Sequence, residues 1–181
     1  MSAPRIPPGR GPRDVGLVAW GVGLVAGRAA GTNPPNLFMT LGRHPKLFRG
    51  WLRFAGRLMP GGTLPRRETE LVILRVAHLR HCAYEFEHHV RLGARAGVTA
   101  EDVERVVAGP GVEAWSARER TLLAAVDELH TDGDLADATW DALRGHLDHR
   151  GLIELVFLVG HYEMLATALQ TLRVQPDRAR A

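Results

Sequence analysis

The sequence predicts an all-α protein built as one helical domain. Apolar side chains recur at the three- and four-residue spacing of a helix face, as at Leu47, Trp51, Phe54 and Leu58. Clusters of proline and glycine separate these periodic stretches. No stretch alternates apolar and polar residues between turn signals, as a half-buried strand does.

The N-terminal half begins with an apolar stretch, Val15–Ala30. Glycines interrupt it and Arg28 lies within it, so its uninterrupted apolar length falls short of the ~20 residues that a membrane span needs. We therefore expect a helix that packs on this chain or is covered by a partner, and no membrane anchor. Proline starts and glycine stops then predict helices at residues 35–41, 46–59, 66–80 and 82–97.

Two capping boxes mark helix starts in the C-terminal half, with the pairs Thr99/Asp102 and Ser116/Glu119. The segment Leu152–Val159 is apolar enough for a buried strand, but its apolar pattern continues at helical spacing and favours a buried helix. The helices predicted after Gly97 cover residues 100–108, 117–130, 137–147 and 152–172.

Composition and charge narrow the functional classes. The 23 basic and 20 acidic residues leave a formal charge of +3, which gives no sign of nucleic-acid binding. A single cysteine excludes an intrachain disulfide and fits a reducing, cytoplasmic location. Residues 1–13 are rich in Pro, Gly and Arg and predict a disordered tail. The predicted domain covers residues 14–175, and residues 176–181 form a second tail.

Residues capable of chemistry gather where the helix at 82–97 begins, at Cys82, Tyr84, Glu85 and His89. Glu85 and His89 are four residues apart and share a helix face. Backbone N–H groups at a helix start favour the thiolate form of Cys82, whereas the nearby Glu85 carboxylate opposes it. The cluster supplies a thiol, a carboxylate and an imidazole, the groups that acid–base chemistry uses. A lone cysteine is also common as a small buried residue.

The spacing of Glu70, Cys82 and His89 resembles a family pattern. In the peroxidase branch of the carboxymuconolactone decarboxylase superfamily, a Glu precedes the first cysteine of a C-x-x-C pair by twelve positions, and a His follows the second by four. The chain resembles this superfamily, which includes the alkylhydroperoxidase D-like proteins, over residues 33–172. Glu85 stands at the second cysteine position, and the run Glu85-Phe-x-x-His89 resembles the Glu-Trp-x-x-His run of the decarboxylase branch.

The resemblance implies a bundle of about six or more helices, assembled as a homo-oligomer (a trimer or a hexamer), with no organic cofactor and no metal. It also implies a small-molecule substrate. Glu70 and Glu85 would orient and polarise this substrate, His89 would donate or accept a proton, and Tyr84 would hydrogen-bond the substrate. An arginine such as Arg75 can bind a substrate carboxylate through two hydrogen bonds.

Other histidines and aromatic residues have two interpretations. His161 and Tyr162 either line the pocket or pack in the core. His78 and His81 are three residues apart, and Glu85 with His89 can complete a set of metal ligands. No His-Glu-x-x-His run accompanies them, so we predict no metal site.

Three functions remain compatible with the sequence. The leading hypothesis is a carboxymuconolactone decarboxylase-like enzyme, a lyase acting by acid–base chemistry on a small carboxylated or lactone-like substrate. The second is a thiol peroxidase in which Cys82 forms a sulfenic acid that an external thiol resolves. The third is a non-catalytic oligomeric scaffold or binding protein with the same fold.

Overall fold

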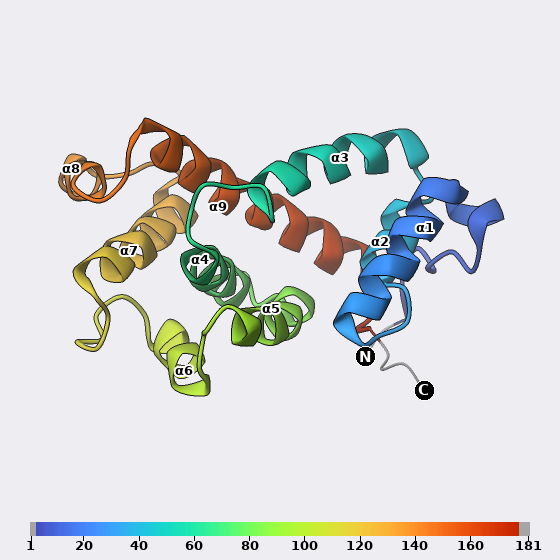
Figure 1. Cartoon of the computed structure of the whole chain (residues 1–181), viewed down its shortest axis with the longest axis horizontal. Coiled ribbons are helices and arrows are strands. Elements are labelled where there is room, and N and C mark those ends of the chain that lie inside the picture. Colours follow the sequence, from blue (N-terminus) through green and yellow to red (C-terminus); the bar gives the residue numbers. More distant parts are fainter. Residues whose placement is uncertain (1–2, 178–181) are drawn as a thin grey trace. The chain divides into compact units, whose positions relative to one another are not determined.

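The computed structural model describes residues 3–177, apart from the side chains of Ala29 and Ala30. The regular elements of this described part are nine α-helices (Figure 1), which confirms the predicted all-α class. The chain divides into two compact units. One holds residues 57–167, and the other holds the residues up to Gly56 together with those from Ala168 onward. The boundaries predicted for one domain, 14–175, stay a prediction.

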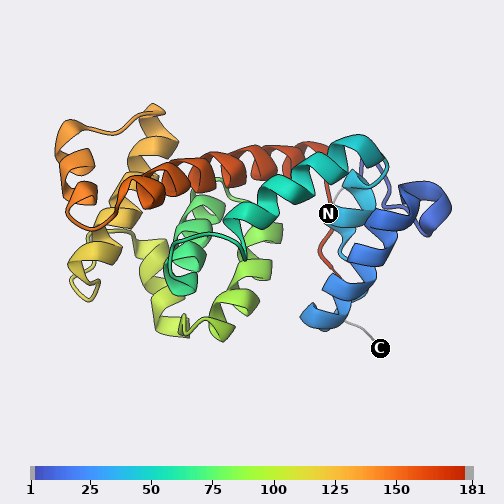
Figure 2. The same cartoon turned by 45° about the horizontal axis from the view of Figure 1, so that its top comes forward.

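The unit of residues 57–167 is organised around α4 (Arg66–Leu79). Figures 1 and 2 show α4 surrounded by its neighbours, and it packs against α5, α6 and α7. Residues 69–77 of α4 are all buried, as expected of a helix enclosed on every side. The other helices that lie wholly or largely in this unit are α5 (Ala83–Arg95), α6 (Ala100–Ala108), α7 (Ala117–Asp132), α8 (Asp137–Arg144) and α9 (His149–Leu172).

Apolar side chains from α4, α6 and α7 form the core of this unit. Burying each such side chain contributes about 1.5–3 kcal/mol to the free energy of unfolding. Trp115 enters the same core, and its indole N–H donates to the carbonyl of Gly109 at 3.1 Å, so no polar group is left unsatisfied there. The buried members of this core are Leu71, Leu74, Val98, Val106, Trp115 and Leu123.

Helix ends in this unit follow the sequence signals. Thr99 Oγ1 accepts a hydrogen bond from the backbone N–H of Asp102 at 3.2 Å, and the Asp102 carboxylate accepts one from the N–H of Thr99 at 3.0 Å. Ser116 and Glu119 form the same reciprocal pair at the start of α7. Gly97 follows α5 with φ 82°, a conformation that glycine adopts without strain. Both predicted capping boxes are therefore confirmed.

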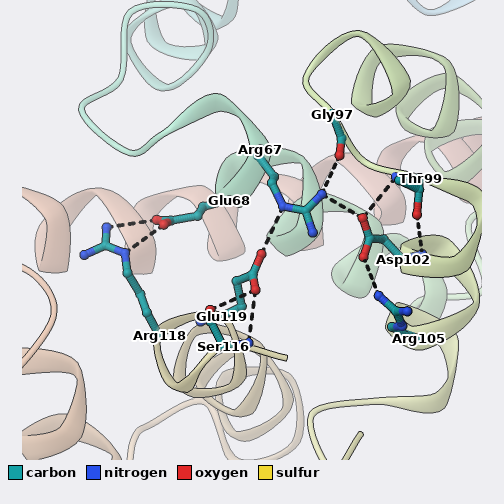
Figure 3. A network of polar contacts seen from close by, with 9 residues as sticks. All are labelled: Arg67, Glu68, Gly97, Thr99, Asp102, Arg105, Ser116, Arg118 and Glu119. Carbon is teal, nitrogen blue, oxygen red and sulfur yellow. Dashed lines mark hydrogen bonds and ion pairs between the residues drawn. The ribbon is translucent and has the colours of Figure 1, made fainter. Parts of the chain in front are cut away.

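Charged side chains join α4 to α6 and α7 in a group that we call the Arg67 network (Figure 3). Arg67 pairs with Asp102 at 2.7 Å and with Glu119 at 3.0 Å. The hydrogen bond from Arg67 lowers the pKa of Asp102 to about 2, although burial acts in the opposite direction. Next to Glu119 in the first turn of α7, Arg118 binds both oxygens of Glu68 at 2.7 and 2.9 Å. The network fixes the first turn of α4 against its neighbours.

Helix α9 is continuous through Leu152–Val159, which confirms the prediction of a buried helix in place of a strand. Its Glu154 carboxylate accepts the N–H groups of Thr63 and Leu64, the latter at 3.0 Å, in the loop before α4. No side chain fits at Gly62, because a Cβ there would collide with this carboxylate. By length and composition α9 is the one described helix that can cross a membrane, and half of its most apolar window is buried inside the protein.

The second unit contains α1 (Pro12–Ala30), α2 (Asn36–Leu41) and α3 (Pro45–Leu58), apart from the last residues of α3. Helix α1 is broken at Gly16, where φ is 79°. Gly27 lies so close to the backbone of Asn33 that a Cβ would collide with its carbonyl. This close approach lets α1 pack on α2. The core of the unit consists of Val15, Ala19, Met39 and Phe48, with Phe38 and Trp51 packed on it.

The outer face of α1 exposes apolar side chains, with Leu17 80% and Val25 68% accessible. Part of the predicted N-terminal tail is held by backbone hydrogen bonds, from Arg5 to Leu172 and from Gly9 to Met39, each at 3.0 Å. The remaining parts of the predicted tails, residues 1–2 and 178–181, lie outside the described residues.

Candidate active site

A tight turn between α4 and α5 brings the buried faces of these helices together. The N–H of Cys82 donates to the carbonyl of Ala77 at 2.9 Å and closes the end of α4. His81, within the turn, has φ 51°, in the left-handed region that non-glycine residues seldom adopt. Helix α5 then starts with Cys82 as its N-cap residue. The turn thereby places the first two turns of α5 against the middle of α4.

Glu70, His89 and Glu85 form a buried row that we call the Glu–His–Glu relay. His89 Nδ1 lies 2.7 Å from Glu70 Oε2, and His89 Nε2 lies 3.3 Å from Glu85 Oε2. The three residues are 0%, 2% and 3% exposed, respectively. Three residues that the sequence singled out are thus brought together around one imidazole.

Arg66 holds the outer end of the relay. Its Nε and Nη2 atoms lie 2.8 and 2.6 Å from Glu70 Oε1, the oxygen that His89 does not use. The Arg66 side chain is 39% exposed, whereas Glu70 is fully buried. Arg66 therefore links a buried carboxylate to solvent and fixes its orientation, since both carboxylate oxygens now have separate partners.

The relay stabilises the charged form of His89. Burial lowers the pKa of His89, but the hydrogen bonds and charges of Glu70 and Glu85 outweigh burial and raise this pKa to about 9. The imidazole therefore carries its second proton at neutral pH. With the partly exposed Arg66, the row then pairs two cations with two carboxylates.

The inner end of the relay is incomplete. Glu85 Oε1 is buried and has no hydrogen-bond partner among the described residues. A buried carboxylate oxygen without a partner costs free energy, so native structures seldom keep one without a reason. Glu85 Oε1 is therefore the acceptor of the relay that lacks a partner among the described residues.

Two side chains of α9 close the site. The Tyr162 ring meets the His89 ring edge to face, with centroids 5.1 Å apart. Burial and the charges of Glu85 and Glu70 raise the pKa of Tyr162 well above its usual value, so its hydroxyl stays protonated. Burial also lowers the pKa of His161, which the charge of Glu85 partly offsets. Both predicted α9 residues therefore lie beside the relay.

Cys82 lies on the floor of an open cleft of about 330 Å³. Burial raises the pKa of the Cys82 thiol, and the Glu85 carboxylate adds to this, whereas the backbone N–H groups of Glu85 and Tyr84 lower it. The net result favours the thiol, because burial outweighs the helix start. The cleft is lined by Ala77, His78, His81, Cys82, Ala83, Phe86, Glu87 and Val107.

Two predicted site residues have partners outside the relay. The Tyr84 ring stacks on that of His88, with centroids 6.4 Å apart. Arg75 binds both oxygens of Asp127 on α7, at 2.6 and 2.8 Å, and donates to the carbonyl of Val106 at 2.7 Å. Arg75 therefore joins three helices, and the structure does not bring it into the relay.

Sequence reasoning did not single out Arg66. Its four-residue spacing from Glu70 was the available signal, since such pairs meet on a helix. Within residues 3–177, no three His, Cys, Asp or Glu side chains are grouped as metal ligands.

Residues 45–128, which contain the turn, the whole relay and Cys82, match the family model of the carboxymuconolactone decarboxylase family. This match covers the residues that carry the site and confirms the predicted resemblance to the carboxymuconolactone decarboxylase superfamily. The interpretation of Glu85 at the second cysteine position stays a prediction. No curated protein matches the sequence.

Solved structures of the superfamily's alkylhydroperoxidase-like fold resemble the chain. A peroxidase-related protein from Ralstonia eutropha JMP134, described as an alkylhydroperoxidase AhpD core, has a TM-score of 0.85 at 18% identity, covering 97% of this chain and 93% of its own. A peroxidase-related protein from Silicibacter sp. TM1040 has a TM-score of 0.83 at 17% identity, and the match covers 97% of this chain and 95% of that protein. The debrominase Bmp8, in complex with 2,3,4-tribromopyrrole, has a TM-score of 0.79 at 16% identity, and the match covers 97% of this chain and 91% of that protein.

Proposed function

We propose that this protein is an enzyme that performs acid–base chemistry on a small carboxylated or lactone-like molecule, without an organic cofactor. The observation that carries the proposal is the relay, in which a protonated His89 lies between two buried carboxylates. General acids need a proton that is held at working pH and can still be transferred, and the position of His89 supports both requirements. The inner oxygen of Glu85 provides the exit for that proton.

The proposed step is proton transfer at a carbon next to a carbonyl. Loss of CO2, or removal of a proton by the Glu85 carboxylate, leaves an electron pair on this carbon, and the carbonyl delocalises the pair. After loss of CO2, Glu85 takes the proton that His89 holds and delivers it to the carbon, and His89 then recovers a proton from solvent. After removal of a proton, Glu85 returns the proton that it has taken. Glu70 and Arg66 keep the imidazole oriented through this cycle. No thiol takes part, in line with the raised pKa of Cys82.

The family match and the similar structures support the class of substrate, but not the reaction. The matching family is named after a decarboxylase, and the structure of Bmp8 holds a small planar ring compound. Together they favour a small molecule as substrate.

We further propose a cytoplasmic homo-oligomer, a trimer or a hexamer, without a nucleic-acid or membrane partner. The exposed apolar side chains of Leu17, Val25, Phe157 and Met164 support this, because such side chains are commonly covered by a second subunit.

Turnover of a panel of lactones, with and without a carboxylate, tests the acid–base proposal. We expect Glu85→Gln and His89→Ala to abolish turnover, because each variant interrupts proton transfer. Cys82→Ser should keep measurable turnover, since the thiol has no role in the step. Loss of turnover in Cys82→Ser alone, with the relay variants active, would refute the proposal.

A second candidate function is thiol-dependent peroxide reduction, favoured by the position of Cys82 on the floor of the cleft. In it, the Cys82 sulfur attacks a peroxide oxygen, the O–O bond breaks, and the alcohol leaves with a sulfenic acid formed. An external thiol then reduces the sulfenic acid. Intact mass after stoichiometric hydroperoxide is the test: an added oxygen supports this candidate, and an unmodified Cys82 after prolonged exposure excludes it.

A further inference from the structure

Helices α1 and α9 each expose an apolar stripe with a glycine at its centre. The glycine is Gly21 on α1 and Gly160 on α9, and among the described residues nothing beyond the adjoining helix backbone lies within 4 Å of a Cβ placed at either position. Large apolar side chains are exposed around each glycine at the spacing of one helix face. They are Leu17, Val18, Leu24 and Val25 in the α1 stripe, and Ile153, Val156, Phe157 and Met164 in the α9 stripe.

Each stripe has the shape and chemistry to receive a second helix. Side chains of one helix pack as ridges into the grooves of another, and a central glycine lets the two backbones approach closely. Covering the apolar side chains removes them from water, which contributes about 25 cal/mol for each Å² of apolar surface buried. Leu17 and Val18 also line an apolar groove of about 300 Å³ between α1 and α3. The α1 stripe therefore offers a recess as well as a face.

The two stripes belong to units of opposite charge. Residues 1–56, which contain α1, have eight Lys or Arg and one Asp, whereas residues 57–167, which contain the α9 stripe, have 12 Lys or Arg and 18 Asp or Glu. The contrast is also present beside the stripes. Residues 132–150, which lead into α9, carry five exposed aspartates and two exposed arginines. The exposed charges on α1 and just before it are Arg10, Arg13, Asp14 and Arg28.

Charge decides which faces can meet. Two α1 stripes in contact would bring together two positive units, and two α9 stripes would bring together two negative units, and like charges oppose association. A contact between an α1 stripe and an α9 stripe pairs opposite charges, which also favours encounter. An anionic membrane surface would attract residues 1–56 but repel the acidic unit, and the α9 stripe would stay uncovered. A second copy of the chain covers both stripes.

We propose that the α1 stripe of one copy of this chain packs on the α9 stripe of a second copy. This inference rests on the homo-oligomer of the proposed function, and it names the two faces that meet. The contact joins unlike faces, so each copy in the assembly binds one neighbour through α1 and another through α9. Repeated contacts of this kind close into a ring when the rotation between copies allows it, as in a trimer.

Gly21→Gln and Gly160→Gln test the contact, because a long polar side chain at the centre of a stripe keeps the second helix away. Glutamine favours a helix more than glycine does, so the fold should be kept, which circular dichroism checks. We expect each variant to raise the dissociation constant of the assembly by about tenfold or more, measured by sedimentation velocity. Gly50→Gln is the matched control, since Gly50 is an exposed glycine of α3 outside both stripes, and it should assemble as the wild type does.

A mixture of the two variants tests whether unlike faces meet. The Gly160→Gln chain keeps its α1 stripe and the Gly21→Gln chain keeps its α9 stripe, so one intact contact can form between them. We expect the mixture to give a complex larger than either variant alone, with equal numbers of both chains. Native mass spectrometry counts the chains when one variant carries ¹⁵N.

The outcomes separate this contact from the proposals on which it depends. Full assembly of either variant alone, no complex in the mixture, or an equal loss of assembly in Gly50→Gln overturns the contact and leaves the homo-oligomer standing. A wild-type chain that is a monomer refutes the homo-oligomer and the contact together. None of these measurements uses turnover, so the acid–base proposal is tested separately by the relay variants.

Discussion

Arg66 and Arg67 are neighbours in the first turn of α4, yet they serve two charged networks of opposite character. Arg67 binds Asp102 and Glu119, and every carboxylate oxygen of that pair has a partner. Arg66 binds Glu70, and the relay that continues from it ends at an oxygen of Glu85 without a partner among residues 3–177.

The difference shows how similar residues give structure in one place and chemistry in another. Complete pairing in the Arg67 network moves the pKa of Asp102 to about 2, far from neutral, so the charge is fixed and holds helices together. In the relay a proton sits on an imidazole between two acceptors, and one acceptor atom is left over. Substitutions in each network should therefore affect different measured quantities.

The largest expected effect is on turnover in His89→Ala. Loss of the imidazole removes the proton held between Glu70 and Glu85, so we expect turnover to be abolished within detection, a fall on the order of 10⁴-fold, the upper end of the usual contribution of a general acid or base. Steady-state kinetics measures this fall, and circular dichroism checks that the fold is kept. His88→Ala, which removes the adjacent imidazole outside the relay, should retain most activity. An equal loss of turnover in His88→Ala would show that the effect is not specific to His89.

The next effect is on stability in Arg67→Met. Removing this guanidinium leaves Asp102 and Glu119 without their shared partner, so we expect the free energy of unfolding to fall by about 2–4 kcal/mol, as when one member of a largely buried ion pair is removed. Urea unfolding measures the change. Arg91→Met, at an exposed position on α5, should change it by under about 0.5 kcal/mol. A matching loss in the control would place the effect outside the network.

The two networks should lose stability at opposite ends of the pH scale. The pKa of Asp102 is about 2 in the fold against an ordinary 3.8, so its stabilisation is present above that value and is lost as the pH falls toward 2. The pKa of His89 is about 9 against 6.5, so its stabilisation is complete below 6.5 and is lost as the pH rises through 9.

Urea unfolding between pH 2 and pH 10 measures both losses, on the order of 2 kcal/mol for Asp102 and on the order of 3 kcal/mol for His89 over the full range. Asp102→Asn should flatten the acid side of the curve and His89→Ala the alkaline side. If the alkaline side of the stability curve is the same with and without His89→Ala, the raised pKa of His89 is contradicted.

The smallest effect on stability is expected in Arg66→Met, about 1 kcal/mol or less, because its side chain is partly exposed. Without this cation, Glu70 interacts with His89 alone, so the pKa of His89 should rise and the alkaline limb of the activity profile should move to higher pH. Arg66→Lys should restore most of the original profile. A profile that does not move would leave Arg66 as a surface ion pair without influence on the relay.

Local signals predicted most of the fold. The capping boxes at Thr99 and Ser116 located α6 and α7, because side chain and backbone pair there within one turn. Boundaries without such pairs were less accurate: α8 ends at Arg144 and not at residue 147, and α9 begins at His149 and not at residue 152. The break in α1 at Gly16 had no distinctive local signal, since several other glycines of that helix keep helical geometry.

The residues of the relay were singled out in two ways: Glu85 and His89 by their shared helix face, and Glu70 by the family pattern. Arg75 shows where such reasoning ends. The partner of Arg75 is Asp127 on another helix, and nothing in the sequence near Arg75 specifies that pairing. Similarly, burial by the rest of the fold raises the pKa of the Cys82 thiol more than the backbone N–H groups at the helix start lower it. Position at a helix start alone predicts a lowered pKa.

Glu154 shows how a residue remote from the substrate can constrain the reaction. Its carboxylate ties α9, which carries Tyr162, to the loop that leads into Arg66 and Glu70. Glu154 therefore fixes both α9 and the start of α4. Few amino acids should be tolerated at this position, although it lies away from the reacting groups. Among random variants selected only for turnover, replacements of Glu154 should be as rare as those of the relay, although Glu154 handles no proton.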